Sequence, residues 1–315
     1  MSKKIILLLC LLGSFGILAA TLFGHLARWV DLAEFVVSLR PLLFLTGSLL
    51  LLSSFLLKQK QAAIIVTLSL CINLIEFAPY ILPSTSAPRT NLSVLFYNVD
   101  KIRMQRVSID EVADLLDQTQ PDIAVLREVG VEQAAELISA FESQYPHTLA
   151  YQHSEIDGFV ILSRFPLKNT EIIQLGGGRQ VGIADVEIDG KLLHLVAPHP
   201  TNALHGIEER NRQLATIADY VATAPRPLMI VGDLNVTMWS GWYKQIERAG
   251  VRNVRIGNGI MPSWKIPGAV FPGTLIYIPL DHILVSKDIG IFSAETLLSP
   301  GSDHQPLLAR LKVDQ

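Results

Sequence analysis

The chain has 315 residues, half of them hydrophobic, and a formal net charge of −3 with His neutral. This balance fits neither an ordinary soluble enzyme nor a protein lying entirely in a membrane, because the apolar residues are concentrated in the first 82 positions. Residues 84–315 carry 20 Lys and Arg against 26 Asp and Glu, a net charge of −6, and no Lys/Arg-rich run. They therefore lack the basic footprint of a non-specific DNA-binding protein.

Three apolar runs make up the N-terminal part. Residues 5–23 contain no charge over 19 positions, residues 41–57 none over 17, and residues 62–82 only Glu76 over 21. Since a helix needs about 20 apolar residues to cross the hydrocarbon core, the runs predict three transmembrane helices that anchor residues 1–82 in a lipid bilayer. A cleaved signal peptide is the alternative for the first run, but the two runs that follow favour an uncleaved anchor. Glu76 is expected near the end of the third helix rather than as a polar contact inside the bundle.

The Lys and Arg residues that flank these helices predict their orientation. Lys3, Lys4, Lys58 and Lys60 would share one side, and Arg28, Arg40 and Arg89 the other. The bias of four against three, with the Lys pairs close to the helix ends, predicts a cytoplasmic N-terminus and places everything after residue 82 outside. The loop 25–40 is expected to be either an interfacial helix or an ordinary connector.

A Pro/Ser-rich linker is predicted at residues 83–90, followed by a single domain over residues 91–315. Strands are predicted at 92–97, 123–126, 159–162, 181–188, 192–196, 228–231, 282–285 and 307–311, and helices at 108–118, 131–141, 207–221 and 239–249. Ser108 and Glu111 have the spacing of a capping box, and Asp189-Gly190 predicts a hairpin. Hairpins among helices indicate mixed sheets in a layered α/β sandwich.

Polar residues of a few types follow most of these apolar strands. They are Asn98, Glu128, His199, Asp233, Asn235, Asp281, Asp303 and His304. An apolar run that ends in this way is typical of a buried strand that delivers a polar side chain to the edge of a sheet. Several such ends in one place would form an oxygen-rich pocket with imidazoles beside it, which is the composition of a Mg²⁺-dependent phosphoester hydrolase site.

The order of these motifs resembles the endonuclease/exonuclease/phosphatase superfamily over residues 91–312. The motifs are Asn98, Glu128, Ser163-Arg164, His199, Gly232-Asp233-Leu234-Asn235, Asp281-His282 and Ser302-Asp303-His304. His199-Pro200 followed by the sequence RNRQL at 210–214 resembles bacterial members with N-terminal membrane helices. The resemblance implies a four-layer α/β/β/α sandwich of two mixed sheets, preceded by the three-helix transmembrane segment. With the predicted orientation, it implies a multi-pass protein of the bacterial inner membrane whose catalytic domain is periplasmic.

The resemblance also implies a metal site. Glu128 would be the main Mg²⁺ ligand, Asn98 would help to hold the metal or the scissile phosphate, and Asp303 would add a metal-side or water-activating carboxylate. Mn²⁺ is expected to substitute, since the domain offers oxygen and imidazole groups and no thiolate. The family usually has Gln before this Glu, and this chain has Arg127, which either points away from the metal or binds phosphate.

Asp233 and Asn235 flank Leu234, so on an extended segment their side chains would point the same way. By resemblance, Asp233 orients or deprotonates the attacking water, and Asn235 holds a phosphate oxygen or that water. The alternative interpretation of this motif is an Asx turn after the strand.

The remaining catalytic roles fall to the motifs with His. By resemblance, Asp281 fixes the tautomer of His304, whose ring faces the phosphate, as in a catalytic triad. His199 would donate to a phosphoryl oxygen in the transition state. His282 should face opposite to Asp281 and is interpreted as structural.

Several further residues are weaker candidates. Arg210 and Arg212 would either grip a non-scissile phosphate or lipid head group, or form a solvated helix face. Residues 176–179, with three Gly and one Arg, are interpreted as a loop rather than a phosphate-binding nest. Trp264 and Phe271 would line the substrate cleft or cover the core beneath a long loop.

The sequence thus predicts a membrane-anchored, Mg²⁺-dependent phosphoester hydrolase that uses in-line attack by water. Net negative charge and tethering favour a phospholipid or small phosphoester as substrate, and a nuclease acting on DNA or RNA is the alternative. A non-catalytic membrane module on the same fold is a second alternative, which the presence of Asp233, Asn235 and His304 disfavours. No protein partner is predicted.

Overall fold

The computed structural model describes residues 2–84, 87–99, 107–151, 158–177, 179–266 and 276–313. These residues form two compact units. The helical unit consists of Met1–Leu82 together with Thr237–Lys244, and the sandwich unit consists of Pro83–Val236 and Gln245–Gln315. Residues 85 and 86 of the predicted linker lie outside the described residues.

The helical unit contains four α-helices and a short 3₁₀ helix. They are α1 (Lys3–Phe23), η1 (Gly24–Leu26), α2 (Asp31–Ser38), α3 (Arg40–Leu56) and α4 (Lys60–Ile81). Among the described residues, two helices are long and apolar enough to cross a membrane, Lys3–Leu26 and Lys60–Ile81. The pair of α2 and α3, bent by 62°, makes a third if it counts as one span. A helix, α2, therefore occupies the loop predicted at 25–40.

Several polar side chains of this bundle are buried, and many large apolar side chains are exposed. Thr21 Oγ1 and Ser69 Oγ lie 2.8 Å apart, and Asn73 Nδ2 donates to the Ser69 carbonyl at 2.9 Å. Arg40, also buried, donates to Asn73 Oδ1 at 3.4 Å. The exposed positions of α1, α3 and α4 include Leu8, Leu12, Leu49, Leu52, Ile64 and Ile75. Exposed large apolar side chains around buried polar contacts are typical of helices that pack in lipid.

The sandwich unit is built on two six-stranded sheets. The first has the order β13 (Ile289–Thr296), β14 (Leu307–Val313), β1 (Leu92–Asn98), β2 (Ile123–Arg127), β4 (Phe159–Ser163) and β3 (His147–Tyr151). The second has the order β5 (Leu167–Gln174), β6 (Gln180–Ile188), β7 (Lys191–Ala197), β8 (Leu228–Asp233), β12 (Asp281–Ser286) and β9 (Val251–Asn253). A two-stranded sheet pairs β10 (Trp264–Lys265) with β11 (Tyr277–Ile278). The β1–β2 and β7–β8 pairs are parallel and the others antiparallel, so both large sheets are mixed.

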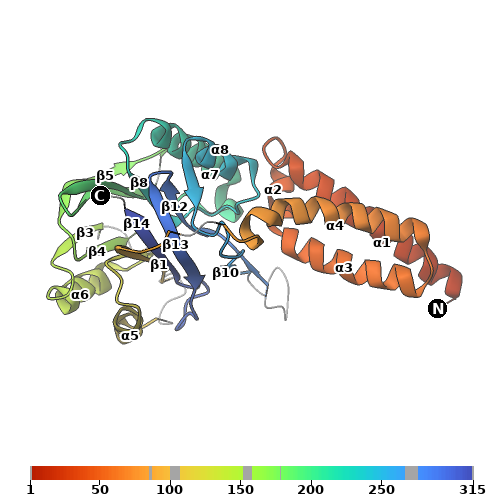
Figure 1. Cartoon of the computed structure of the whole chain (residues 1–315), viewed down its shortest axis with the longest axis horizontal. Helices are drawn as coiled ribbons and strands as arrows, with labels where there is room; N and C mark the ends of the chain where they lie inside the picture. The colour runs from red at the N-terminus through yellow and green to blue at the C-terminus, as the bar shows by residue number, and fades with distance from the viewer. Residues whose placement is uncertain are drawn as a thin grey trace. The chain divides into compact units, whose positions relative to one another are not determined.

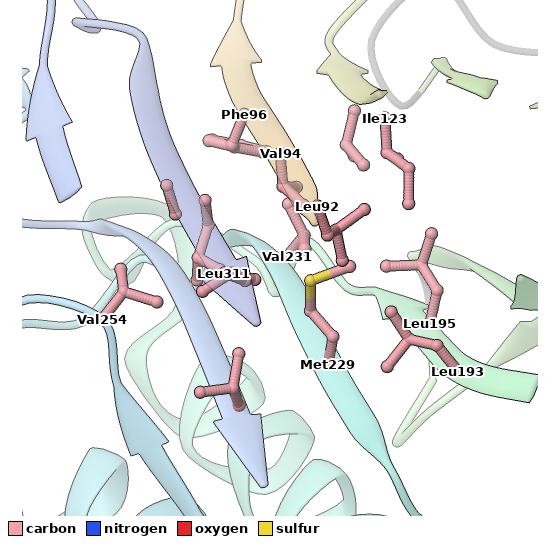
Figure 2. Close-up of a cluster of buried hydrophobic side chains, with 14 of the residues drawn as sticks. Leu92, Val94, Phe96, Ile123, Leu193, Leu195, Met229, Val231, Val254 and Leu311 are labelled. Carbon is pink, nitrogen blue, oxygen red and sulfur yellow. The ribbon is translucent and has the colours of Figure 1, made fainter. Parts of the chain in front are cut away.

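The main core lies between the two sheets. Figure 2 shows side chains of β1, β7 and β8 meeting there, among them Val94, Leu195 and Met229. Each such side chain contributes about 1.5–3 kcal/mol when it is fully buried. A second core packs the other face of β1, with Leu95 and Tyr97, against two helices.

Helices cover the outer faces of the sandwich. They are α5 (Ile109–Thr119), α6 (Val131–Phe141) and α7 (Ala203–Thr223). A further helix, α8 (Gly241–Arg248), follows β8 in the chain. Figure 1 shows α5 and α6 on one side of the sheets and α7 on the other. The predicted α/β/β/α order of layers is confirmed, as is the capping box of Ser108 and Glu111 at the start of α5.

Candidate active site

The ends of the central strands bring polar side chains into the space between the sheets. In β1, Val94 and Phe96 face the inter-sheet core, and the period of two gives Asn98 the same direction. In β8, Met229 and Val231 lead in the same way to Asp233. In β12, Asp281 has the direction of the core residues Ile283 and Val285. Asn98, Asp233 and Asp281 are each at most 2% exposed.

Two carboxylates and one amide converge at the first of these ends. Asn98 Nδ2 donates to Glu128 Oε1 at 3.1 Å and to Asp233 Oδ2 at 3.2 Å. Glu128 directly follows β2 and has a φ of 56°, a left-handed conformation that is uncommon outside Gly. The chain therefore turns sharply after Arg127, and the carboxylate of Glu128 reaches the site from this turn.

His199 lies against both carboxylates. Its Nε2 is 3.5 Å from Glu128 Oε1 and 3.7 Å from Asp233 Oδ2. Its Nδ1 is 3.4 Å from Nη1 of Arg179. Because a guanidinium only donates, Nδ1 is the acceptor and Nε2 carries the hydrogen. Burial, with the charges of Arg127 and Arg179, holds the pKa of His199 well below its usual value, so the ring is neutral.

Gly232 allows the end of β7 to approach β8. A Cβ at this position would collide with the carbonyl oxygen of Pro198, the residue before His199. The glycine of the Gly-Asp-Leu-Asn motif is therefore a packing requirement that sets how near His199 comes to Asp233.

The segment after β8 differs from the prediction. The expectation that Asp233 and Asn235 point the same way from an extended segment is wrong, because β8 ends at Asp233 and Asn235 has a φ of 51°. Instead, Asp233 Oδ1 accepts the Asn235 backbone N–H at 2.8 Å, which is the Asx turn given as the alternative. The Asx turn is compatible with a role of Asp233 in the site, because the turn uses Oδ1 and the other carboxylate oxygen, Oδ2, reaches Asn98. Asn235 Nδ2 donates to the Pro200 carbonyl at 3.0 Å.

Asp281 and His304 form a buried pair. His304 Nδ1 lies 2.9 Å and 3.0 Å from the two carboxylate oxygens of Asp281, and its Nε2 is 3.8 Å from Asp233 Oδ2. Burial alone would lower the pKa of His304, but the Asp281 carboxylate raises it to about 10. Burial raises the pKa of Asp233 to about 7, and the charge of Asp281 adds to this effect. At neutral pH the site therefore contains an imidazolium beside a carboxylate that can take up a proton.

The residues present fit a divalent metal at the Asn98 end of the site. Asp233, Asp281 and His304 also bring one ligand atom each within 4.8 Å of one another. However, His304 is paired as an imidazolium with Asp281 and has no lone pair to offer a metal in that state. Glu128 and Asp233, by contrast, both accept a hydrogen bond from Asn98 Nδ2, so two carboxylates lie around one amide, and carboxylate and amide oxygens are the ligand types of hard cations. A cation there would also relieve the repulsion between the two carboxylates.

The terminal Ser-Asp-His motif is fixed to its surroundings by several bonds. Ser302 Oγ donates to the Asn98 carbonyl at 2.8 Å and accepts from the His304 N–H at 3.0 Å. Asp303 Oδ2 accepts from Trp264 Nε1 at 3.1 Å, and its Oδ1 is 4.0 Å from His304 Nε2. Asp303 therefore contacts the His304 side of the site. Phe271 lies outside the described residues.

The three arginines predicted to bind substrate lie in different surroundings. Arg127 is fully buried, over the ring of Phe159 at 5.0 Å, and donates to the Gln180 carbonyl at 3.2 Å. Arg210 is also buried and donates to the Asn235 carbonyl at 2.8 Å. Arg212 is exposed and pairs with Glu209 on the surface of α7. Of the three, only Arg212 is open to solvent.

Residues that the sequence analysis did not single out also support the site. Gln213 accepts the Thr201 N–H at 2.7 Å and donates to the Gly177 carbonyl at 2.8 Å, which joins the loop before Arg179 to the segment after His199. The position of Gln213 in the RNRQL sequence was a usable signal. Arg255 is buried and donates to the Asp281 carbonyl at 2.8 Å, and nothing in the sequence around it indicated this.

His282 faces away from the site, as expected. Its Nε2 donates to the Val236 carbonyl at 2.8 Å, and its Nδ1 accepts from Asn253 at 3.2 Å. Burial, with the charge of Arg255, lowers the pKa of His282 to about 3, so this ring is neutral and structural.

Comparison with known proteins gives matches of two kinds. The model of the Endonuclease/Exonuclease/phosphatase family matches residues 95–304. A UPF0294 protein of Vibrio cholerae is 28% identical over 130 residues, which cover 40% of this chain and 42% of the relative. A UPF0294 protein of Yersinia pseudotuberculosis is 25% identical over 210 residues, or 62% of this chain and 70% of the relative. The match thus spans less than half the length of the Vibrio relative.

Solved structures share the fold of the sandwich unit. D. rerio TDP2 complexed with a single-strand DNA product has a TM-score of 0.59 at 17% identity, over 70% of this chain and 98% of that chain. The 3′–5′ exonuclease NExo of Neisseria meningitidis has a TM-score of 0.56 at 18% identity, over 70% and 99%. At these identities the likeness is one of fold alone.

Proposed function

Because this chain belongs to the endonuclease/exonuclease/phosphatase family, we propose that it is a divalent-metal-dependent hydrolase of phosphoester bonds, anchored in a membrane by residues 1–82. The observation that carries this proposal is the meeting of three groups at the ends of the sheets. These are the Asn98–Glu128–Asp233 cluster, the neutral His199 above it, and the Asp281–His304 pair beside it.

Glu128 and Asn98 would hold the metal through their oxygen atoms, and we take the metal to be Mg²⁺ with Mn²⁺ as a substitute. A bound divalent ion supplies positive charge that stabilises the phosphate oxygens in the transition state. Asp303 was predicted as a further ligand. Its contacts with Trp264 and His304 favour the other role predicted for it, a carboxylate that acts on water or protons.

Asp233 is the residue we assign as proton acceptor. Its Oδ2 faces Asn98, His199 and His304, and burial raises its pKa above the usual value, which makes the ionised carboxylate more basic towards water. As the water oxygen bonds to phosphorus in line with the leaving oxygen, Asp233 Oδ2 takes the water proton and the bond from phosphorus to the leaving oxygen breaks. The leaving oxygen takes a proton from the His304 imidazolium or from solvent and departs as an alcohol. The Asx turn to Asn235 fixes the direction of this carboxylate.

The two histidines would stabilise the charge on phosphate. His199 presents a neutral Nε2–H, and His304 presents the Nε2–H of an imidazolium that Asp281 holds in place. Arg127 and Arg210 are buried, so we propose that they support the site without contacting the substrate. Arg127 would act by its charge, and Arg210 by its hydrogen bond to the Asn235 carbonyl. Arg212 remains the candidate for direct contact with substrate.

The membrane part of the proposal is supported by the helical unit. Its exposed apolar side chains suit lipid, and two to three of its helices are long and apolar enough to cross a bilayer. The placement of Lys3, Lys4, Lys58 and Lys60 supports a cytoplasmic N-terminus. Since the relatives are bacterial, we propose the inner membrane as the location, with the sandwich unit in the periplasm.

For the substrate we propose a phospholipid or a small phosphoester. An anchored domain with a net charge of −6 over residues 84–315 suits a substrate that is delivered at the membrane better than a polyanion. A nucleic acid is the second candidate. It is favoured by the DNA bound in two structures of the same fold, the single-strand product on D. rerio TDP2 and the product hairpin on Neisseria NExo.

The test is hydrolysis by the purified full chain in detergent micelles. The substrates are bis(p-nitrophenyl) phosphate, phospholipid vesicles, sugar phosphates, a DNA hairpin with a 3′-phosphate, and RNA. We expect Mg²⁺ or Mn²⁺ to support turnover of at least one class, EDTA to abolish it, and added Mg²⁺ to restore it. Full activity after exhaustive dialysis against EDTA would refute the metal mechanism. A folded protein that hydrolyses none of these classes would point to the non-catalytic membrane module.

A further inference from the structure

The helical unit includes a segment that lies far from it in sequence. Thr237–Lys244 belongs to this unit with Met1–Leu82, and it begins two residues after Asn235. Thr237 and Ser240 are fully buried, and Met238 and Trp239 are at most 3% exposed. The segment that follows Asp233 and Asn235 in the chain is therefore buried, and it belongs to the same unit as the proposed membrane anchor.

Two carboxylates of the helices hold this segment through polar contacts. Glu34 in α2 is 3% exposed, and its Oε1 accepts from Ser240 Oγ at 2.7 Å. The same hydroxyl oxygen accepts the Trp242 N–H at 3.0 Å, which closes a turn. Glu76 in α4 accepts from Lys244 Nζ at 2.9 Å. A buried carboxylate is costly to desolvate unless it is hydrogen-bonded, so the contact with Ser240 stabilises both partners. Glu76 thus makes a polar contact within the unit, which the sequence analysis had ranked second.

Aromatic and close backbone contacts continue the same interface. Trp239 packs edge-on against Phe77 of α4, with ring centroids 5.5 Å apart at 61°. The guanidinium of Arg28 lies over the ring of Trp242 at 5.7 Å. A Cβ at Gly241 would come within 2.9 Å of the Cβ of Arg28, so the chain approaches the helices more closely than a larger residue would allow. These contacts add to the buried packing of Trp239 against Phe77 within the helical unit.

We propose that Glu34 and Glu76 are positioning residues for the reaction, because they hold residues 237–244 and thereby the turn that carries Asp233 and Asn235. This inference rests on the proposed function. It differs from simple anchoring. In that case residues 1–82 would only keep the enzyme at the membrane, and loss of their contacts with residues 237–244 would leave kcat unchanged.

The first test asks where residues 237–244 lie and does not depend on activity. Arg28→Cys and Gly241→Cys are combined in the full chain with Cys10→Ser and Cys71→Ser, which removes both native thiols. A disulfide needs Cβ atoms about 3.5–4.5 Å apart, so mild oxidation should link positions 28 and 241 after a small adjustment. The control pair is Gly241→Cys with Ser53→Cys. Ser53 lies near the C-terminal end of α3, and this pair should stay reduced. Absence of the disulfide between positions 28 and 241, measured by mass spectrometry, would overturn the proposal.

The second test measures the kinetics of the full chain with Mg²⁺ and bis(p-nitrophenyl) phosphate. Glu34→Ala should lower kcat by about tenfold, which corresponds to about 1.4 kcal/mol, with little change in KM. Glu34→Gln keeps an acceptor for Ser240 and should retain most of the activity. Glu76→Ala should lower kcat less, because its pair with Lys244 is partly exposed. The matched control is Glu295→Ala, whose carboxylate pairs with Arg310 on the exposed surface, and it should leave kcat unchanged.

Rescue separates positioning from general damage. The oxidised link between positions 28 and 241, added to Glu34→Ala, should restore kcat, and reduction of this disulfide should remove the effect. If Glu34→Ala keeps the wild-type kcat although the link forms, the helices only tether the enzyme and the proposal is wrong. If the wild-type chain hydrolyses nothing, the proposed function fails and the catalytic role of Glu34 with it, whereas the cross-link still decides where residues 237–244 lie.

Discussion

Asp233 uses its two carboxylate oxygens for different purposes. Oδ1 accepts the Asn235 N–H and closes the turn, and Oδ2 faces Asn98, His199 and His304. The turn costs the chain a left-handed residue at Asn235, which is a strain of about 1–3 kcal/mol. Asp233 thus has a structural role, the hydrogen bond to Asn235, and a proposed catalytic role as proton acceptor. A substitution can remove the second role and keep the first.

Asp233→Asn tests this separation. The variant keeps an acceptor for Asn235 but cannot take a proton, so kcat should fall by a factor of about 10² to 10⁴. Burial raises the pKa of Asp233 above its unfolded value, so the stability linked to protonation is present below the unfolded pKa and is lost as pH rises through about 7. At pH 8 in EDTA the thermal midpoint of the variant should therefore equal or exceed that of the wild type. Wild-type turnover in this variant would rule out Asp233 as the base.

His282 should make the protein sensitive to acid. Its pKa is about 3 in the folded protein and near 6.5 when unfolded, so below pH 6.5 the unfolded chain binds a proton that the native state does not. The free energy of unfolding should then fall as pH drops toward 3, by at most about 1.4 kcal/mol per pH unit. His282→Gln, which can still donate to the Val236 carbonyl, should lose this part of the pH dependence. The measurement is the thermal midpoint of both proteins from pH 7.5 to pH 5, and parallel curves would contradict the assignment.

Most site residues could be predicted from their order in the chain, but their geometry could not. The strand period gives Asn98, Asp233 and Asp281 one direction, and they do meet. The positive φ of Glu128 and of Asn235 depends on tertiary context, which is why the alternation argument for Asn235 was wrong. Arg179 was assigned to a loop rather than to the site, and Arg255 was missed because it lies in no motif.

At the scale of elements, the eight predicted strands are the eight inner strands of the two large sheets. The four unpredicted strands of these sheets, β3, β5, β9 and β13, are their four edges. Inner strands are buried on both faces and read as continuous apolar runs. An edge strand such as β5, with the sequence LKNTEIIQ, is mostly exposed and carries polar residues, so hydrophobicity alone does not reveal it.

Gly232→Ala tests how β7 and β8 fit together. The added Cβ would meet the Pro198 carbonyl, and the strand end that carries His199 must move away from Asp233. We expect a loss of about 1–3 kcal/mol in stability, typical of overpacking, together with a clear fall in kcat. The matched control is Gly206→Ala in α7, where the nearest side-chain atoms are at ordinary distances of 3.5 Å and 3.6 Å. Equal behaviour of the two variants would show that the close approach is unimportant.

At the scale of the whole molecule, composition and motif order were enough to predict the family, the layers of the sandwich and the apolar helices. The membership of Thr237–Lys244 in the helical unit was not predictable. Its contact between Glu34 and Ser240 joins residues 206 positions apart, and no local pattern signals a pairing at that separation.

Sidedness is the prediction that belongs to this scale. The Lys pairs 3/4 and 58/60 predict that the C-terminal part of the chain is outside the cytoplasm. Alkaline phosphatase fused after Gln315 should then be active in a bacterial host, and green fluorescent protein exported at the same point should be dark. The reverse pattern would place the sandwich unit in the cytoplasm and favour nucleotides or RNA as substrates.

The pairing of β1 with β14 has a consequence for biosynthesis. The first strand of the sandwich is hydrogen-bonded on one side to the last, with Leu92 opposite Leu311. This sheet therefore cannot close until β14 has been synthesised, and such long-range pairing folds slowly. Before β14 emerges from the ribosome, β1 can pair with β2 on one side but has no partner on the other. The candidate site, whose residues run from Asn98 to His304, is therefore incomplete during the synthesis of everything that precedes β14.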